Sequence, residues 1–431
     1  MNAPAKIGVG LLGCGNVGSA LAQMLLEDTE NIARRTGITF ELRKVAVRRP
    51  SKDRDVTVPA ELLTDDASAV VNDPDVDVVV ELMGGIEPAR SLITRALELK
   101  KPVVTANKEL MANVGAELSA LAQAQGVDLL YEAAVGGGIP LIRPLRESLA
   151  GERITRVIGI VNGTTNYILT RMTEDGIDYG AALAEAQGRG YAERDPTADV
   201  EGYDAAAKAA ILANVAFGAS LVAGDVYSEG ISGVTQEDIK LAARLGYVVK
   251  LLAIVQSGPK DQVGARVHPT MISARHPLAS VRLSFNALFV EGDSCGELMF
   301  YGKGAGGAPT ASAVLGDVID ASHNRSIGSH GRNPLPMGGG NWPIDEQSSS
   351  FYVTIEVDDR PGVLASVASV FGLHHVSIRS MEQTGLEDEA RLIFITHSAL
   401  ERDVQATLHD LRVLPVVRRV GNVMRVLEED M

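Results

Sequence analysis

The chain has 431 residues, 45% hydrophobic and 22% charged, a balance typical of a globular protein too long for one ordinary domain. Its formal net charge of −15 argues against nucleic acid as a partner, because phosphate binding needs clustered Lys and Arg. Two cysteines, Cys14 and Cys295, cannot form a disulfide framework or a thiolate zinc site. No apolar run approaches the ~18 residues of a membrane span, and no secretory signal precedes the first strand-like segment. We therefore expect a cytoplasmic protein that binds neither nucleic acid nor membrane.

Residues 1–131 alternate predicted strands and helices, which favours a doubly wound α/β (Rossmann) domain with a parallel sheet. Strands are predicted at residues 7–12, 42–47, 76–80, 102–106 and 129–134, and helices at 90–99 and 115–125. The first strand runs into GCGNVG at residues 13–18, and helical apolar spacing follows. This order predicts a dinucleotide site in which backbone N–H groups at a helix start approach a pyrophosphate. The residues expected there are Gly13, Gly15, Asn16, Val17 and Gly18.

The end of the second predicted strand indicates which cofactor is preferred. An NAD site usually offers an acidic residue at this place, whereas this chain offers Arg48 and Arg49. Two guanidinium groups suit a 2′-phosphate and favour NADP; NAD stays open if the arginines only form a solvated strand end. The fourth predicted strand ends in VTANK, so Thr105 and Lys108 lie at the sheet edge that faces the ligand crevice. Lys108 could equally be a solvated lysine.

The pattern changes after residue 131 and predicts three further parts. Residues 132–321 predict an α+β catalytic and oligomerisation domain whose last helix, 311–321, returns to the nucleotide domain. Residues 322–350 are rich in glycine, proline and serine and predict a linker that includes the Gly338–Gly340 run. Residues 351–431 predict a compact βαββαβ domain with its own core.

Residues 190–208, GYAERDPTADVEGYDAAAK, hold several charged groups just before an apolar helix. Asp204 and Lys208 are four residues apart, so on a helix they share one face, a turn apart. An ammonium beside a carboxylate at the foot of an apolar helix is suited to proton transfer. The alternative is a surface ion pair with no catalytic role.

Several long motifs resemble homoserine dehydrogenase across essentially the whole chain. They are GCGNVG at 13–18, VTANK at 104–108, EAAVGGGIP at 132–140, NGTTNYIL at 162–169, GYAERDPTADVEGYDAAAK at 190–208 and GKGAGGAPTASAV at 302–314. The resemblance implies NAD(P)-dependent interconversion of L-homoserine and L-aspartate 4-semialdehyde, in threonine, methionine and isoleucine biosynthesis. The last domain resembles an ACT domain, which implies feedback by an amino acid, usually threonine in this family. ACT units commonly pair, so a homodimer or homotetramer is expected.

The resemblance also implies roles for single residues. Lys208 matches the proton donor to the carbonyl oxygen, and Asp204 matches the carboxylate that binds the substrate hydroxyl and holds Lys208. Glu193 suits the substrate's α-ammonium, and the hydroxyl- and amide-rich turn 162–166 could take its carboxylate. The remaining expected substrate contacts are Gly190 and Lys108, and Gly306 joins the cofactor contacts.

The loop that follows the fifth predicted strand resembles the family's monovalent cation loop. Its implied ligands for Na⁺ or K⁺ are a side-chain oxygen of Glu132 and the backbone carbonyls of Val135, Gly137 and Ile139. Oxygen ligands without His or Cys are chemically consistent with a hard cation. From the residues alone, a tight glycine turn is the alternative.

Two other functions stay open beside this one. A non-catalytic amino-acid sensor would make Glu193, Asp204 and Lys208 dispensable. An ACT-bearing dehydrogenase of another hydroxy acid would not need the 162–208 motifs, so substrate exchange would distinguish it.

Overall fold

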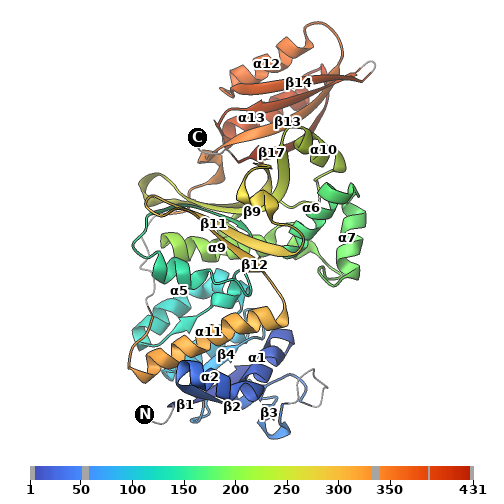
Figure 1. The fold of residues 1–431 in the computed structure, drawn as a ribbon. Helices are drawn as coiled ribbons and strands as arrows, with labels where there is room; N and C mark the ends of the chain where they lie inside the picture. Colours follow the sequence, from blue (N-terminus) through green and yellow to red (C-terminus); the bar gives the residue numbers. More distant parts are fainter. Residues whose placement is uncertain (1–4, 51–57, 332–339, 387–388, 428–431) are drawn as a thin grey trace. The chain divides into compact units, whose positions relative to one another are not determined.

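The structure, a computed structural model, describes residues 5–50, 58–331, 340–386 and 389–427. They form two compact units, each built from segments distant in sequence (Figure 1). The first unit comprises Met1–Val157, Ala207–Asp225 and Asn286–Gly338. The second comprises Ile158–Ala206, Val226–Phe285 and Gly339–Met431.

The first unit contains a six-stranded parallel sheet with the order β3-β2-β1-β4-β5-β6. The strands are β1 (Ala5–Leu12), β2 (Ile38–Ala46), β3 (Leu63–Thr64), β4 (Val78–Glu81), β5 (Val103–Thr105) and β6 (Leu129–Leu130). The helices are α1 (Asn16–Glu27), α2 (Thr29–Thr36), α3 (Ala67–Val71), α4 (Ala89–Glu98), α5 (Lys108–Gln125) and α11 (Gly307–Ser326). The strand order reverses at β1, as in a doubly wound nucleotide-binding domain. The predicted α/β fold is therefore confirmed.

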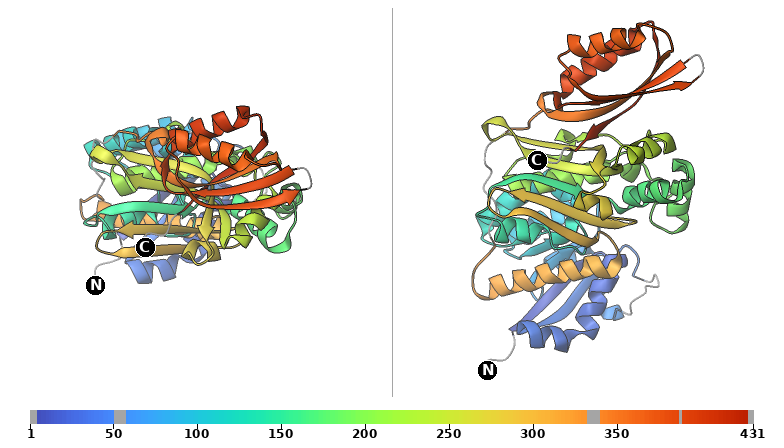
Figure 2. Two further views of the ribbon diagram at one scale, coloured as in Figure 1. Left: turned by 90° about the horizontal axis from the view of Figure 1, so that it is seen from above. Right: turned by 45° about the horizontal axis from the view of Figure 1, so that its top comes forward.

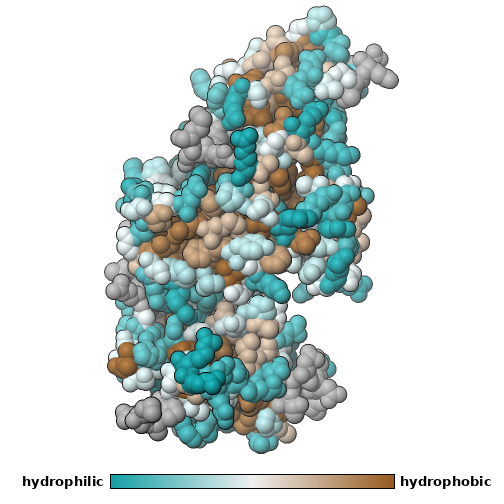
Figure 3. All heavy atoms as spheres, viewed as in Figure 1, coloured by the Kyte–Doolittle hydropathy of each residue, from teal (hydrophilic) through white to brown (hydrophobic). Residues whose placement is uncertain are grey.

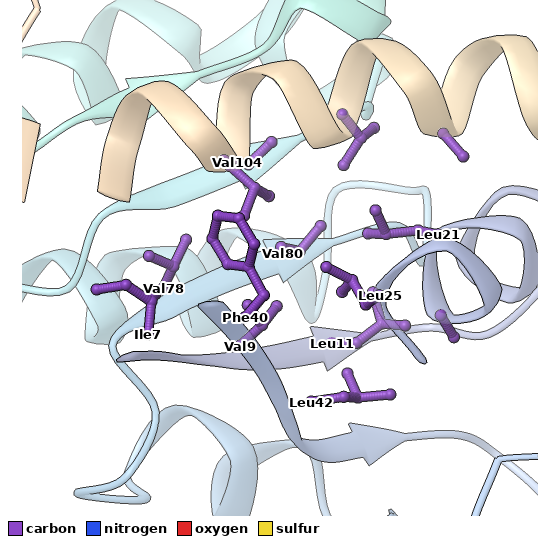
Figure 4. Close-up of a cluster of buried hydrophobic side chains, with 14 of the residues drawn as sticks. Ile7, Val9, Leu11, Leu21, Leu25, Phe40, Leu42, Val78, Val80 and Val104 are labelled. Carbon is purple, nitrogen blue, oxygen red and sulfur yellow. The ribbon is translucent and has the colours of Figure 1, made fainter. Parts of the chain in front are cut away.

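The core of this unit lies between the sheet and the helices α1 and α11 (Figure 4). Val9 and Leu11 alternate toward this face of β1, and Leu21 and Leu25 of α1 share a helix face at i,i+4 spacing. Val318 of α11 belongs to the same cluster, and all five side chains are at most 2% exposed. The packing of α11 fixes its N-terminus at the edge of the sheet where β1 ends.

Among the described residues, three elements run from one unit into the other, namely β7 (Ile154–Ile160), α9 (Tyr203–Phe217) and β11 (Phe285–Gly292). β11 (Phe285–Gly292) and β12 (Gly296–Lys303) are neighbouring strands. Short 3-10 or π turns are η1 (Ala60–Leu62), η2 (Glu132–Ala134), η3 (Pro144–Ser148), η4 (Ala223–Asp225), η5 (Pro259–Asp261), η6 (Pro277–Ser280) and η7 (Ile344–Glu346).

The second unit contains a mixed sheet in which strands follow the order β9-β10-β17-β13-β15-β14. Its strands are β8 (Tyr227–Ser228), β9 (Tyr247–Ser257), β10 (Val263–Ser273), β13 (Ser348–Asp358), β14 (Ile378–Leu386), β15 (Glu389–Thr396), β16 (Ala399–Leu400) and β17 (Val417–Val426). Its helices are α6 (Gly163–Asp175), α7 (Tyr179–Gly188), α8 (Thr197–Val200), α10 (Gln236–Arg244), α12 (Val363–Leu373) and α13 (Glu401–Val413).

The C-terminal part has the predicted βαββαβ order, β13-α12-β14-β15-α13-β17. Both of its helices cover the same face of its sheet (Figure 2). Val363, Val367 and Phe371 follow one another at i,i+4 spacing on α12 and are at most 5% exposed. Phe371 packs on Phe394 of β15 with ring centroids 4.9 Å apart.

Several predicted boundaries are wrong. The strand predicted at 129–134 ends at Leu130 and becomes the turn η2, because the Glu132 side chain bonds to backbone further along the chain. α5 begins at Lys108 rather than residue 115, because Asn107 caps it by accepting from the Leu110 N–H. The elements α2, α3 and β3 were not predicted. Regular structure also enters both ends of the predicted 322–350 linker, where α11 continues to Ser326 and β13 begins at Ser348.

Part of the predicted linker, residues 332–339, lies outside the described residues and includes two of the Gly338–Gly340 glycines. On the face drawn in Figure 3, hydrophilic side chains are spread over both units. No helix within the described part of the chain is long and apolar enough to cross a membrane.

Candidate active site

The glycine motif forms the turn from β1 into α1, and its three glycines meet different demands. Gly13 has φ 98°, and a Cβ there would lie 2.7 Å from the Leu82 carbonyl oxygen. A Cβ on Gly18 would lie 2.3 Å from the Gly13 oxygen, so both positions require close backbone packing. Around Gly15, in contrast, nothing lies within 4 Å of a Cβ. The α1 N-terminus is therefore open to a ligand.

A second helix begins beside the first. Gly306 precedes α11 with φ 117°, and a Cβ on Gly307 would lie 2.9 Å from the Asn16 carbonyl oxygen. Two helices of 12 and 20 residues therefore begin next to each other. Their free N–H groups and positive dipole ends fit the pyrophosphate of a dinucleotide.

The two candidate specificity arginines leave the sheet at the same edge. Leu12 of β1 pairs with Ala46 of β2, and the chain continues from there to the exposed Arg48 and Arg49. Because parallel neighbours end together, these arginines lie on the side of the sheet that carries the glycine motif. This placement suits a 2′-phosphate on the adenosine ribose.

A cavity of about 320 Å³ in the first unit brings the two predicted lysines together. Lys108 enters from the first turn of α5, and Lys208 enters from the part of α9 that belongs to this unit. The lining also includes Ala134 and Gly137 of the predicted cation loop, Thr310 of α11, and Gly84 and Gly85 after β4. Polar groups from five distant segments thus converge on one small-molecule site.

The wall of this cavity depends on Glu81, which sequence reasoning missed. Glu81 is fully buried, and its Oε1 accepts hydrogen bonds from the N–H groups of Met83 (2.7 Å) and Gly84 (3.1 Å). The Thr105 hydroxyl donates to Glu81 Oε2 at 2.6 Å, so Thr105 supports the wall of the cavity. Asn107 Nδ2 donates to the Gly85 carbonyl at 2.6 Å. The sequence signal that could have revealed Glu81 is an acidic residue at the end of an otherwise apolar strand.

In the second unit, Asn162 holds the predicted catalytic carboxylate. Asp204 is 6% exposed, and its Oδ2 accepts from Asn162 Nδ2 at 2.9 Å. The same amide nitrogen donates to Asp199 Oδ1 at 2.7 Å. The Asn162 oxygen accepts from the Thr165 N–H at 2.9 Å and so caps α6. Asp204 and Lys208 then lie one turn apart on α9, as predicted.

The 162–166 segment is held by its own side chains, and its binding of the substrate carboxylate stays a prediction. It forms the first turn of α6, because Asn162 is an N-cap. The Thr164 hydroxyl donates to the Tyr191 carbonyl at 2.6 Å, and Asn166 Nδ2 donates to the Leu283 carbonyl at 2.9 Å. These buried side chains support the neighbouring segments.

The segment around Glu193 is held by its backbone. Gly190 has φ 75°, a conformation that favours glycine, and it turns the chain after α7. Gln187 Nε2 donates to the Glu193 carbonyl at 3.0 Å. The Glu193 carboxylate remains exposed and can receive a cationic group.

Lys250 of β9 is a buried cation that bonds to α6. It is 3% exposed, and its Nζ donates to Asn166 Oδ1 (2.9 Å) and the Val281 carbonyl (2.6 Å). Burial lowers the pKa of Lys250 to about 8. Lys250 thus joins α6 to the loop before β11 at an electrostatic cost.

The predicted cation loop offers buried carbonyl oxygens. Within the described residues, the carbonyls of Val135, Gly137 and Ile139 accept no hydrogen bond. The Glu132 carboxylate accepts from the N–H groups of Leu141, Ile142 (2.8 Å) and Arg143 (2.8 Å). Only the Arg143 N–H donates to Oε2, so this oxygen keeps a lone pair that can bind an ion. This donor set fits a hard monovalent cation.

No group of three or more His, Cys, Asp or Glu side chains suited to a metal occurs in the part of the chain that the structure describes. Cys14 lies in the glycine turn with its Sγ 3.5 Å from the Ser19 hydroxyl and packs against the core of the first unit.

Family models match three successive segments of the chain. The NAD-binding domain of homoserine dehydrogenase matches residues 13–132, homoserine dehydrogenase matches residues 140–319, and the ACT domain matches residues 351–416.

Whole-chain relatives extend this match. The homoserine dehydrogenase of Corynebacterium glutamicum is 50% identical over 99% of this chain and 96% of that protein. The solved homoserine dehydrogenase from Thiobacillus denitrificans superposes with a TM-score of 0.92 at 39% identity, covering 98% of both chains. A hyperthermophilic archaeal homoserine dehydrogenase solved in complex with NADPH covers 74% of this chain and 98% of its own, with a TM-score of 0.61 and 30% identity. The chain therefore belongs to the homoserine dehydrogenase family, as an NAD(P)-dependent enzyme with a C-terminal ACT regulatory domain.

Proposed function

We propose that Lys208 moves the proton in the interconversion of L-homoserine and L-aspartate 4-semialdehyde. The bound nicotinamide cofactor supplies or accepts the hydride. Lys208 donates a proton to the carbonyl oxygen during reduction and removes it from the hydroxyl during oxidation. The observation that carries this proposal is the cavity that Lys208 shares with Lys108, the end of β5 and the 133–137 loop.

Asp204 binds the substrate hydroxyl and orients Lys208 from one turn away on α9. This role is supported by the Asn162 amide, which donates to the buried Asp204 carboxylate and holds it in place. Glu193 binds the α-ammonium of the substrate with its exposed carboxylate, beside the turn at Gly190. Lys108 contacts the substrate or the nicotinamide end of the cofactor.

The cofactor is held at the two adjacent helix N-termini. Gly13, Gly15, Asn16, Val17 and Gly18 of the α1 turn and Gly306 before α11 approach the pyrophosphate. Arg48 and Arg49 bind a 2′-phosphate, so NADP is preferred over NAD. Thr105 contributes by holding the Gly84 turn through Glu81.

A monovalent cation, Na⁺ or K⁺, binds in the 132–139 loop. Its ligands are the carbonyl oxygens of Val135, Gly137 and Ile139 together with the remaining lone pair of Glu132 Oε2. The ion stiffens the wall of the cavity that carries Gly137.

Threonine is the proposed effector of the ACT domain. A cavity of about 370 Å³ lies at the turn from β13 into α12 and is lined by Asp359, Arg360 and Val363. Arg360 and the α12 N-terminus suit an amino-acid carboxylate, and Asp359 suits an ammonium. We also propose that the protein is a homodimer or a homotetramer. Measurement of its molecular mass in solution tests this proposal.

The direct test follows NADPH absorbance while the purified chain meets L-homoserine with NADP⁺ or NAD⁺. Each reaction is run in NaCl, KCl and choline chloride, with and without L-threonine. We expect reduction of NADP⁺ in preference to NAD⁺, faster with Na⁺ or K⁺ than with choline, and suppressed by threonine. If L-homoserine reduces neither cofactor but another hydroxy acid does, the result would favour an ACT-bearing dehydrogenase of that other substrate.

A further inference from the structure

A buried carboxylate on α11 binds both ends of the cation loop. Asp317 is 2% exposed, and its Oδ2 accepts the Glu132 N–H at 2.7 Å. Its Oδ1 accepts from Arg143 Nη2 at 2.9 Å. Glu132 begins the loop and Arg143 follows it, so one side chain holds the two positions between which the loop closes.

The base of the loop is closed a second time by Glu132 itself. Its carboxylate accepts the backbone N–H groups of residues 141–143. These hydrogen bonds join the two ends of the loop to each other, whereas Asp317 joins both ends to α11. The segment between these two ends contains Val135, Gly137 and Ile139, whose carbonyl oxygens accept no hydrogen bond within the described chain.

Helix α11 also connects the loop to the cofactor end of the site. It begins at Gly307 beside the α1 turn, contributes Thr310 to the cavity, and reaches Asp317 about 15 Å further along its axis. Arg143 has a second partner on α11, since its Nε lies 2.9 Å from Asp320 Oδ2. Asp320 is a more exposed partner, with 40% of its side chain accessible compared with 3% for Asp317.

We propose that Asp317 is the positioning residue of the cation loop. It holds Glu132 and Arg143 so that the carbonyls of Val135, Gly137 and Ile139 converge on one ion. This inference rests on the proposed monovalent cation site. A supporting residue of this kind typically changes metal affinity by about 10- to 100-fold when it is altered.

Asparagine at position 317 tests the role with little change in shape. Both partners of Asp317 are donors, the Glu132 N–H and the Arg143 guanidinium. An amide offers one acceptor and one donor, so Asp317→Asn can satisfy only one of them. Asp320→Asn is the matched control, because the same substitution removes the charge of the outer partner of Arg143 and leaves both contacts of Asp317.

The experiment measures the melting temperature of the cofactor-free enzyme against Na⁺ concentration, with choline chloride holding ionic strength constant. We expect a saturable Na⁺-specific rise in the wild type, a midpoint at least about tenfold higher in Asp317→Asn, and a midpoint within about twofold of wild type in Asp320→Asn. A purely structural role would lower the melting temperature of Asp317→Asn equally at every Na⁺ concentration, which would overturn the inference.

If Asp317→Asn does not fold, Arg143→Lys replaces it. Its ammonium lacks the planar fork by which Arg143 bonds Asp317 through Nη2 and Asp320 through Nε, so the Na⁺ midpoint is expected to rise, and an unchanged midpoint would overturn the inference. No specific Na⁺ or K⁺ effect in the wild type would contradict the cation site itself. A wild-type effect that both variants retain would contradict only the role of Asp317.

Discussion

Replacing Lys250 by methionine removes an ammonium group that β9 holds inside the second unit. The side chain is 3% exposed and has two oxygen acceptors, Asn166 Oδ1 and the Val281 carbonyl. Methionine has a similar length and no charge, so it fills the same space without the cost of desolvating a cation. It also leaves those two acceptors without their donor.

The size of the effect depends on pH. Burial lowers the pKa of Lys250 from 10.5 to about 8. This shift means that the folded state is destabilised by about 3 kcal/mol when Lys250 is charged. Below about pH 8 both folded and unfolded chains hold the proton, and the cost is present in full. Between about pH 8 and 10.5 the unfolded chain holds more protons than the folded one. The free energy of unfolding therefore rises with pH across this window.

The assay is urea unfolding followed by tryptophan fluorescence. The only tryptophan, Trp342, lies in the second unit, where a Cβ on Gly258 next to β9 would lie 2.6 Å from its ring. We expect the difference in unfolding free energy, wild type minus Lys250→Met, to increase by about 2 kcal/mol between pH 7.5 and 9.5. Taking the difference removes titrations that both chains share. A difference that is flat or falls with pH would refute the assignment of Lys250 as a destabilised buried cation.

Two further substitutions test the cofactor and substrate assignments. Arg48→Ala should weaken NADP⁺ binding by about tenfold or more, because a charge-assisted contact to the 2′-phosphate is lost, and should leave NAD⁺ within about twofold. Equal losses in the two dissociation constants would contradict that contact. Asn162→Ala should cost about 1 kcal/mol of stability as a lost cap and lower kcat/KM by about tenfold, because Asp204 loses its donor. Asn162→Ser restores the cap but not the reach to Asp204, so recovery of full activity in that variant would contradict the positioning role.

Local patterns predicted the parts of the site that lie on single elements. The strand, glycine turn and helix at residues 7–25 depend on neighbours in sequence, and the structure has them as predicted. Asp204 and Lys208 share α9 because four-residue spacing is a property of any helix. The βαββαβ order of the last domain likewise followed from alternating strand and helix patterns.

Contacts between distant residues could not be predicted in this way. Glu132 and Asp317 are separated by 185 positions, and their contact exists only because α11 returns to the nucleotide sheet. Glu81 had no visible partner in sequence, since the Thr105 hydroxyl reaches it from a neighbouring strand. The NGTTN segment was expected to be a ligand turn, because a capping asparagine and a ligand-binding asparagine have the same sequence context. In the structure the Asn162 side chain caps α6 and bonds to Asp199 and Asp204, which are distant in sequence, while the binding of a substrate by this segment stays a prediction.

The measurement that tests the central claim most directly is the turnover of Lys208→Ala with L-homoserine and NADP⁺. Lys240→Ala, at an exposed position of α10, is the matched control. General acid–base catalysis predicts that kcat falls by about 10²-fold or more in Lys208→Ala, with the dissociation constant of NADP⁺ little changed and the control unaffected. Retention of most turnover by Lys208→Ala would contradict the proton-transfer role of Lys208.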